Sequence, residues 1–172
     1  TLTLPAGSSA RVHAPLVRKK WSVRENPVAS SRSDTVNSSG APQSSFTLLD
    51  GSSRTTADLK GKVALINFWA TSCTTCVAEM PMLVSTYEKF RSRGYETIAV
   101  AMSYDPPSYV VNFAQTRNLP FQVAIDNTGA IAQSWGEVKL TPTTYIVNKR
   151  GDIVKRYVGE PDFTELHALI EK

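Results

Sequence analysis

Cysteine and histidine, the usual ligands of structural zinc, are scarce in this sequence: its 172 positions include two cysteines, Cys73 and Cys76, and two histidines, His13 and His167. A structural zinc site needs about four ligands, and neither histidine stands at ligand spacing from the cysteines. No stretch approaches the roughly 18 consecutive apolar residues that a membrane-spanning helix requires. The length is nevertheless sufficient for one domain with a proper hydrophobic core.

Most of the chain carries no excess of basic over acidic residues. The net charge is +4, from 19 basic and 15 acidic residues. Residues 1–45 hold six of the basic and two of the acidic residues, which leaves 13 of each for residues 46–172. We therefore expect no nucleic-acid-binding surface on the domain.

Two parts of the chain differ in composition. Residues 1–40 are predicted to be a flexible, basic and serine-rich linker or tail, and residues 41–172 a single domain. The leading part shows no sustained apolar period, so it cannot bury enough apolar surface to offset the entropy lost on ordering. Its cluster Arg18-Lys19-Lys20-Trp21 suits either contact with an anionic membrane surface or a solvated tail.

Beyond the leading part, short apolar runs alternate with segments of helical spacing. Val63–Trp69 is almost entirely apolar, as in a strand covered on both faces. In residues 73–93 the large apolar side chains recur every three or four positions, which predicts a helix kinked at Pro81. The next strand, Thr97–Met102, is then parallel to the first. Further strands are predicted at 46–49, 121–125, 145–148 and 153–158, and further helices at 106–116, 130–135 and 163–170, which together indicate an α/β domain with one mixed sheet.

The two cysteines stand three residues apart, where the strand Val63–Trp69 turns into a helix. Only a thiolate attacks a disulfide, and the N–H groups and dipole at a helix N-terminus favour negative charge on a sulfur there. We therefore predict that Cys73 is the exposed attacking thiol and that Cys76, one turn further, is shielded and releases the product. A purely structural bridge would constrain the unfolded chain by only about 2 kcal/mol. A Cys-x-x-Cys pair near a βαβ unit indicates a thioredoxin fold and thiol–disulfide exchange.

Three segments together resemble the TlpA/ResA-type thioredoxin-like proteins: the cysteine-containing Ile66–Pro81, the lead-in from Ala41 to Val63, and Thr141–Val147 with the hairpin after it. The similarity covers residues 41–172. It implies a thioredoxin fold with a mixed central sheet, helices on both faces, an N-terminal strand extension and a central αβ insertion. It also implies an extracytoplasmic or periplasmic thiol–disulfide oxidoreductase that reduces protein disulfides. Such proteins are often tethered to a membrane by an upstream segment, and many act in cytochrome c maturation.

The same resemblance implies partners and no cofactor besides the redox-active Cys73–Cys76 disulfide. The partners are a protein dithiol or disulfide substrate and a membrane or soluble thiol protein that donates electrons. The fold spans potentials of about −270 to −120 mV, so the direction of electron flow stays open. An alternative is a copper-delivery module on the same fold, since soft thiolates suit Cu(I). Such modules use a wider cysteine spacing and a histidine in a later loop, whereas His167 lies in the predicted closing helix.

Further site residues follow from the resemblance. Thr141-Pro142 occupies the place of a cis proline, so we expect a cis peptide bond and substrate contact there; the alternative is an ordinary turn proline. Glu79 matches an active-site glutamate and, three residues past Cys76, is expected on the same side of the helix. A partly buried carboxyl there would hold its proton more tightly and exchange one with the thiol. The alternative for Glu79 is a solvated acid on the helix surface.

Trp69 is a candidate for substrate docking, although packing beneath the active site is the commoner role of such a residue. Asn67 stands where ordinary thioredoxins have a buried aspartate, and its amide cannot carry a proton, which shifts that duty toward Glu79 or water. Two positions depart from the family pattern. Ser72 replaces a tryptophan, and Thr74-Thr75 replaces a pair in which a proline commonly precedes the second cysteine.

Overall fold

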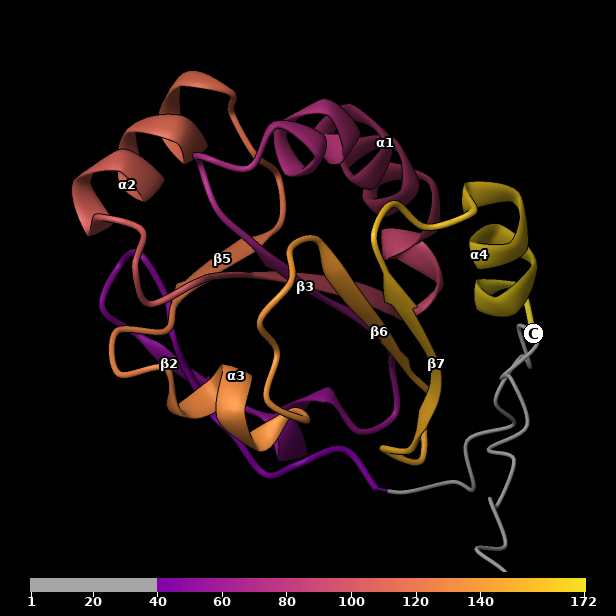
Figure 1. Cartoon of the computed structure of the whole chain (residues 1–172). Helices are drawn as coiled ribbons and strands as arrows, with labels where there is room; N and C mark the ends of the chain where they lie inside the picture. The colour runs from indigo at the N-terminus through magenta and orange to yellow at the C-terminus, as the bar shows by residue number, and fades with distance from the viewer. Residues whose placement is uncertain (1–39) are drawn as a thin grey trace, which may run out of the picture. The chain divides into compact units, whose positions relative to one another are not determined.

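A computed structural model describes residues 40–172, and the prediction of a linker or tail for the leading segment lies outside them. Five strands form the central sheet in the order β5-β4-β3-β6-β7, while β1 and β2 pair separately (Figure 1). The strands are β1 (Ser45–Thr47), β2 (Ser53–Thr55), β3 (Val63–Trp69), β4 (Tyr95–Ala101), β5 (Gln122–Ile125), β6 (Thr143–Val147) and β7 (Ile153–Val158). The helices are η1 (Thr56–Leu59), α1 (Thr74–Phe90), η2 (Arg91–Arg93), α2 (Pro107–Thr116), α3 (Ala130–Ser134) and α4 (Phe163–Ile170).

The central strand β3 decides where the site lies. Its apolar residues are buried from Ala64 to Trp69, as expected for a strand with both faces covered. It pairs with β4 in parallel and with β6 antiparallel, so the ends of β3 and β4 meet the start of β6 at one edge of the sheet. Phe68 stands opposite Thr143, the residue after Pro142. The predicted proline site therefore lies next to the strand end from which the cysteines follow.

Both faces of the sheet are covered, which confirms the predicted fold class. On the first, the α1 face, Leu65 and Trp69 of β3 join a hydrophobic cluster with residues of α1, α2 and α4. On the second, the α3 face, Ile66 and Phe68 of β3 join a cluster with α3 and with the N-terminal extension before β3. Figure 1 shows α1, α2 and α4 on one side of the sheet, and α3 with the extension on the other.

The extension differs in detail from the predicted strand at 46–49. The strand ends earlier, at Thr47, and Leu48 instead forms an isolated bridge with Ala124 of β5. Its partner β2 was not predicted, because Ser53–Thr55 has no apolar residue that would mark a strand. None of the helices within residues 40–172 is long and apolar enough to cross a membrane.

Candidate active site

The two cysteines form a disulfide at the start of α1, and their exposure differs as predicted. Cys73 is the N-cap of the helix, and its Sγ accepts a hydrogen bond from the backbone N–H of Cys76 at 3.1 Å. Cys73 is half-buried, whereas Cys76 has no exposed surface. The N–H group that now touches the Cys73 sulfur is one of the helix N-terminal donors that stabilise a thiolate there.

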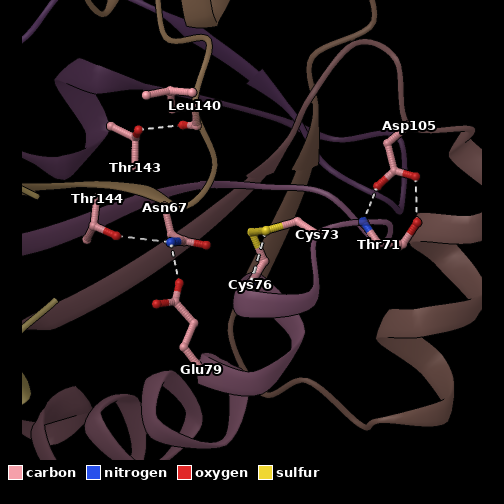
Figure 2. Close-up of a disulfide and its surroundings, with 9 residues drawn as sticks. All are labelled: Asn67, Thr71, Cys73, Cys76, Glu79, Asp105, Leu140, Thr143 and Thr144. Carbon is pink, nitrogen blue, oxygen red and sulfur yellow. Dashed lines mark hydrogen bonds between the residues drawn. A yellow bond between two sulfur atoms is a disulfide. The ribbon is translucent and has the colours of Figure 1, made fainter. Parts of the chain in front are cut away.

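A buried carboxylate holds the loop before Cys73. The two carboxylate oxygens of Asp105 accept hydrogen bonds from the N–H and the hydroxyl of Thr71, each at 2.7 Å (Figure 2). Asp105 is 4% exposed and follows the end of β4. Sequence reasoning missed this residue, although its position just beyond a buried parallel strand, at the same edge as the cysteines, was the available signal. The clamp ties the loop after β4 to the loop that presents the attacking sulfur.

The peptide bond between Thr141 and Pro142 is cis, as expected from the resemblance. Pro142 is buried and Thr141 is half-buried. The carbonyl of Pro142 accepts a hydrogen bond from Gly159 at 2.8 Å, and the hydroxyl of Thr143 donates to the carbonyl of Leu140 at 2.6 Å. These bonds hold the segment before β6 at the same end of the sheet as the disulfide. Its role in substrate binding stays a prediction.

Glu79 is not a solvated surface acid, because its side chain is only 1% exposed. It lies one helical turn after Cys76, and its Oε1 accepts a hydrogen bond of 3.1 Å from the Asn67 amide. The same Asn67 nitrogen donates to the hydroxyl of Thr144 at 3.0 Å, so the amide is held from two sides (Figure 2). Sequence reasoning named Asn67 and Glu79 separately and did not find their contact or Thr144, which comes from a strand far along the chain.

Burial controls the acidity of Glu79. The pKa of Glu79 is raised to about 7, mainly because the carboxyl is removed from water. The Asn67 hydrogen bond lowers the pKa by a smaller amount, and the charge of Glu160 contributes to the rise. Within the described residues, Glu79 Oε2 and Asn67 Oδ1 are buried and have no hydrogen-bond partner. A carboxyl group with a pKa near neutrality can both accept and return a proton at physiological pH.

The structure places Trp69 in the core and not on a docking surface. Its side chain has no exposed area and packs on Phe113 of α2, with ring centroids 5.1 Å apart. The residues that flank Cys73 in the sequence, Ser72 and Thr74, are exposed and polar. Exposed apolar surface lies elsewhere at this end of the sheet, where Leu140 is 66% exposed.

The copper alternative lacks a third ligand in the part of the chain that the structure describes. Within residues 40–172, no three His, Cys, Asp or Glu side chains gather where they could hold a metal ion. His167 lies in α4, and its Nε2 is 2.8 Å from the hydroxyl of Thr86. Its ring packs edge-on against Phe90, at the other end of α1 from the cysteines.

A half-buried cysteine at a helix start, a shielded second cysteine and a cis proline at the same sheet edge define the class of thioredoxin-fold thiol–disulfide oxidoreductases. The family model Redoxin matches residues 35–170. The chain belongs to the Redoxin family, and it is a thiol–disulfide oxidoreductase.

Relatives within the family agree with the predicted resemblance. The chain is 34% identical over 132 residues to thiol-disulfide oxidoreductase ResA of Bacillus thuringiensis subsp. konkukian (strain 97-27), across 77% of this chain and 75% of that protein. It is 30% identical over 142 residues to ResA of Bacillus subtilis (strain 168), across 83% and 78%. Among solved structures, a provisionally named thioredoxin from Neisseria meningitidis is 40% identical and superposes with a TM-score of 0.72, across 78% of this chain and 89% of that one.

Proposed function

We propose that this chain is a reductant, which uses the Cys73–Cys76 dithiol to reduce disulfides in partner proteins outside the cytoplasm. The observation that carries the proposal is the buried Glu79 carboxyl, one helical turn from Cys76 and held by Asn67. We further propose that the cysteine pair needs no cofactor and that a second thiol protein, membrane-bound or soluble, returns it to the dithiol state.

The reaction starts at the accessible sulfur. The Cys73 thiolate attacks one sulfur of the substrate disulfide, the substrate S–S bond breaks, and the departing substrate thiolate takes up a proton. Cys76 then transfers its thiol proton to the Glu79 carboxylate and attacks the Cys73 sulfur. This step forms the Cys73–Cys76 disulfide and expels the second substrate sulfur as a thiolate, to which Glu79 passes the proton that it took from Cys76. Two electrons have then moved to the substrate, with one proton from Cys76 by way of Glu79 and one from the solvent, where the Cys73 proton was released.

The electrostatics of Glu79 favour the reducing direction. An ionised carboxylate close to Cys76 disfavours a thiolate there, because two like charges would be buried together. Strong oxidants of this fold owe their potential to a stabilised reduced form with a low-pKa thiolate. A buried acid one helical turn from Cys76 acts in the opposite sense, because its negative charge disfavours a thiolate in the reduced pair and so lowers the potential.

Substrate docking is proposed at the segment before β6. In this proposal the backbone of Thr141, beside the cis Pro142, pairs with an extended substrate chain, as in the addition of a strand to a sheet. Leu140 and Val158, which are 66% and 53% exposed, supply apolar surface on either side of that segment. Val158 pairs with Thr143, so the two apolar side chains belong to neighbouring stretches of the chain.

The compartment and the substrate are inferred from the resemblance. We propose a periplasmic or other extracytoplasmic location, with a membrane tether upstream of residue 1. The disulfide of an apocytochrome c is the proposed substrate, as in cytochrome c maturation. The similarity to proteins named ResA supports this choice. The Cys73–Cys76 disulfide is also compatible with an oxidising compartment.

The reduction potential of the cysteine pair tests the proposal directly. We expect equilibration with a glutathione buffer to give a value closer to about −270 mV than to about −120 mV. Replacing Cys73 with serine should abolish reduction of insulin disulfides, and replacing Cys76 should leave a trapped mixed disulfide. A potential near the upper end of the range would show that the protein is an oxidant and would overturn the proposal.

A further inference from the structure

Basic side chains gather at the end of the sheet opposite the disulfide. Because β6 runs antiparallel to β3, the end of β6 lies beside the start of β3, and β4 begins at that end too. Cys73 follows the other end of β3. Four exposed cations on the turns and the chain end here are called the basic pole: Arg93, Lys149, Arg150 and Lys172.

Two adjoining hollows with an apolar floor lie between these cations. The larger has a volume of about 410 Å³, and its apolar lining is Val63, Ile146, Val154 and Leu169. Three members of the basic pole line it as well, all except Arg93. The smaller hollow, of about 150 Å³, shares Val63 with the first and is lined by Arg93. An occupant of this surface would therefore meet both apolar side chains and positive charge.

The cations of the basic pole have no carboxylate partner within residues 40–172. The ion pairs in that part of the chain are made by other cations, namely Arg54, Lys62, Lys89 and Lys155. Glu171 lines the smaller hollow together with Arg93 and Lys172, but its ion pair is with Lys89, at 4.0 Å, and not with a cation of the pole. The positive charge of the pole is thus available to an external anion.

The polypeptide also enters the domain at this end. Gly40 bridges to Asp152, and the N–H of Ala41 donates to the carbonyl of Gly151 at 2.8 Å, in the turn between β6 and β7 (Figure 1). The sequence before that point carries six basic and two acidic residues. The described part of the chain therefore begins at the same end of the sheet as the basic pole.

We propose that the basic pole is a docking surface for a bilayer that contains anionic phospholipid. The charge is complementary to phosphate headgroups, and the apolar floor suits the acyl region just beneath them. A bilayer also matches the spread of the cations over three places, namely η2, the turn between β6 and β7, and the residues after α4, and the positive charge of the preceding sequence. Docking in this way directs the Cys73–Cys76 end of the domain away from the membrane and toward soluble substrates. The inference does not depend on the direction of electron flow.

Vesicle flotation of the full chain tests the proposal. The parent should bind vesicles of phosphatidylcholine mixed with phosphatidylglycerol and not vesicles of phosphatidylcholine alone. Each cation near an anionic surface changes binding by about fivefold at low salt. The variant Lys149→Gln/Arg150→Gln/Lys172→Gln should therefore bind at least about tenfold more weakly. It should reduce insulin at the parental rate, because the disulfide lies at the other end of the sheet.

A matched variant separates docking from general attraction. Arg117, Lys139 and Arg156 are exposed cations outside the basic pole, and replacing all three with glutamine changes the net charge equally. This variant should bind the mixed vesicles as the parent does. Equal losses in the two variants would mean that net charge alone attracts the chain, and no loss in either would leave the preceding sequence as the only membrane contact. Either result overturns the proposal.

Amide chemical shifts locate the contact. On addition of lipid nanodiscs with phosphatidylglycerol, the resonances of residues 148–154 and 169–172 should shift or broaden, while those of residues 70–76 should not. Shifts centred on the disulfide end would place the membrane on the wrong face. Loss of binding to an acidic polymer such as polyglutamate in the basic-pole variant, with vesicle binding intact, would assign the surface to an acidic protein partner instead.

Discussion

The two faces of the central sheet differ in how many of their buried polar groups have hydrogen-bond partners. On the α3 face, the indole N–H of Trp135 donates to the hydroxyl of Ser44 at 2.9 Å, and the hydroxyl of Tyr145 donates to the carbonyl of Trp135. On the α1 face, four buried side-chain atoms have no hydrogen-bond partner among the described residues. They belong to Asn67, Trp69, Glu79 and Tyr157.

Leaving a buried polar atom unpaired costs about 1–3 kcal/mol, so a protein keeps such atoms only where another requirement outweighs the cost. The α1 face is also the face that holds the cysteines, and Glu79 is one of its unpaired groups. If Glu79 exchanges protons with Cys76 as proposed, the α3 face serves stability, whereas the α1 face gives up stability to keep a buried carboxyl one helical turn from Cys76. Substitutions on the two faces should therefore be felt in different measurements.

The largest effect on stability is expected from Trp135→Ala on the α3 face. Trp135 is 2% exposed and packs on Phe68 and Tyr145, with ring centroids 6.3 and 5.2 Å away. Removing the indole should lower the free energy of unfolding by about 3–5 kcal/mol, measured by urea titration. The folded fraction should still reduce insulin normally. A variant that is fully stable but slow in exchange would contradict the division between the faces.

Glu79→Gln is expected to change the pH dependence of stability on the α1 face. The folded protein holds the Glu79 proton up to a pKa of about 7, whereas the unfolded chain releases it near 4.5. Between these values the native state binds more protons, so the parent should lose stability as pH rises, by about 3 kcal/mol in total. The glutamine variant should not show this loss in urea titrations across that range.

The same substitution is expected to slow the proton-dependent step of exchange. Loss of a general acid–base group at Cys76 should reduce insulin reduction at pH 7 by on the order of a hundredfold. Glu88→Gln, an exposed position on the same helix, is the matched control and should leave both the rate and the stability profile unchanged. Identical pH profiles in the parent and Glu79→Gln would remove Glu79 from the mechanism.

The smallest effects come from a pair of tyrosine substitutions, one on each face. Tyr145→Phe removes a hydroxyl that donates to Trp135, so the free energy of unfolding should fall by about 1 kcal/mol. Tyr157→Phe removes a hydroxyl that lies near Glu165 but makes no hydrogen bond of standard geometry, so stability should change by less than about 1 kcal/mol. Burial and the nearby Glu165 raise the pKa of Tyr157 to about 12, so its hydroxyl is uncharged at neutral pH. Equal losses in the two variants would erase the contrast.

Most of the fold was predictable because its signals are local. The apolar run of β3, the helical spacing of α1 and the turn at residues 149–151 each mark an element within a few residues. The exception, β2, carries no apolar side chain; it pairs with β1, and Leu48, just after β1, bridges to Ala124 of β5. A strand of three polar residues that forms only by pairing with another strand shows no periodic pattern in its own sequence.

Less of the site was predictable, because several of its contacts join residues that are far apart in the sequence. The paired cysteines and the cis proline stand out as short patterns. The clamp of Asp105 on Thr71 joins residues 34 positions apart, and the bond from Asn67 to Thr144 joins residues 77 apart. Sequence reasoning left Trp69 between packing and docking, because exposure depends on which helix covers the strand end.

The sequence by itself predicted the pair of sulfurs that exchange, the one that leads, and the order of strands and helices that carries them, since these predictions follow from spacing along the chain. Only the tertiary structure decided that Glu79 is out of water, that Asn67 holds it, and that four cations share one end of the sheet. Desolvation and contacts between distant residues exist only after the chain has folded. They set the pKa of the Glu79 carboxyl and gather positive charge at the end of the sheet opposite the disulfide.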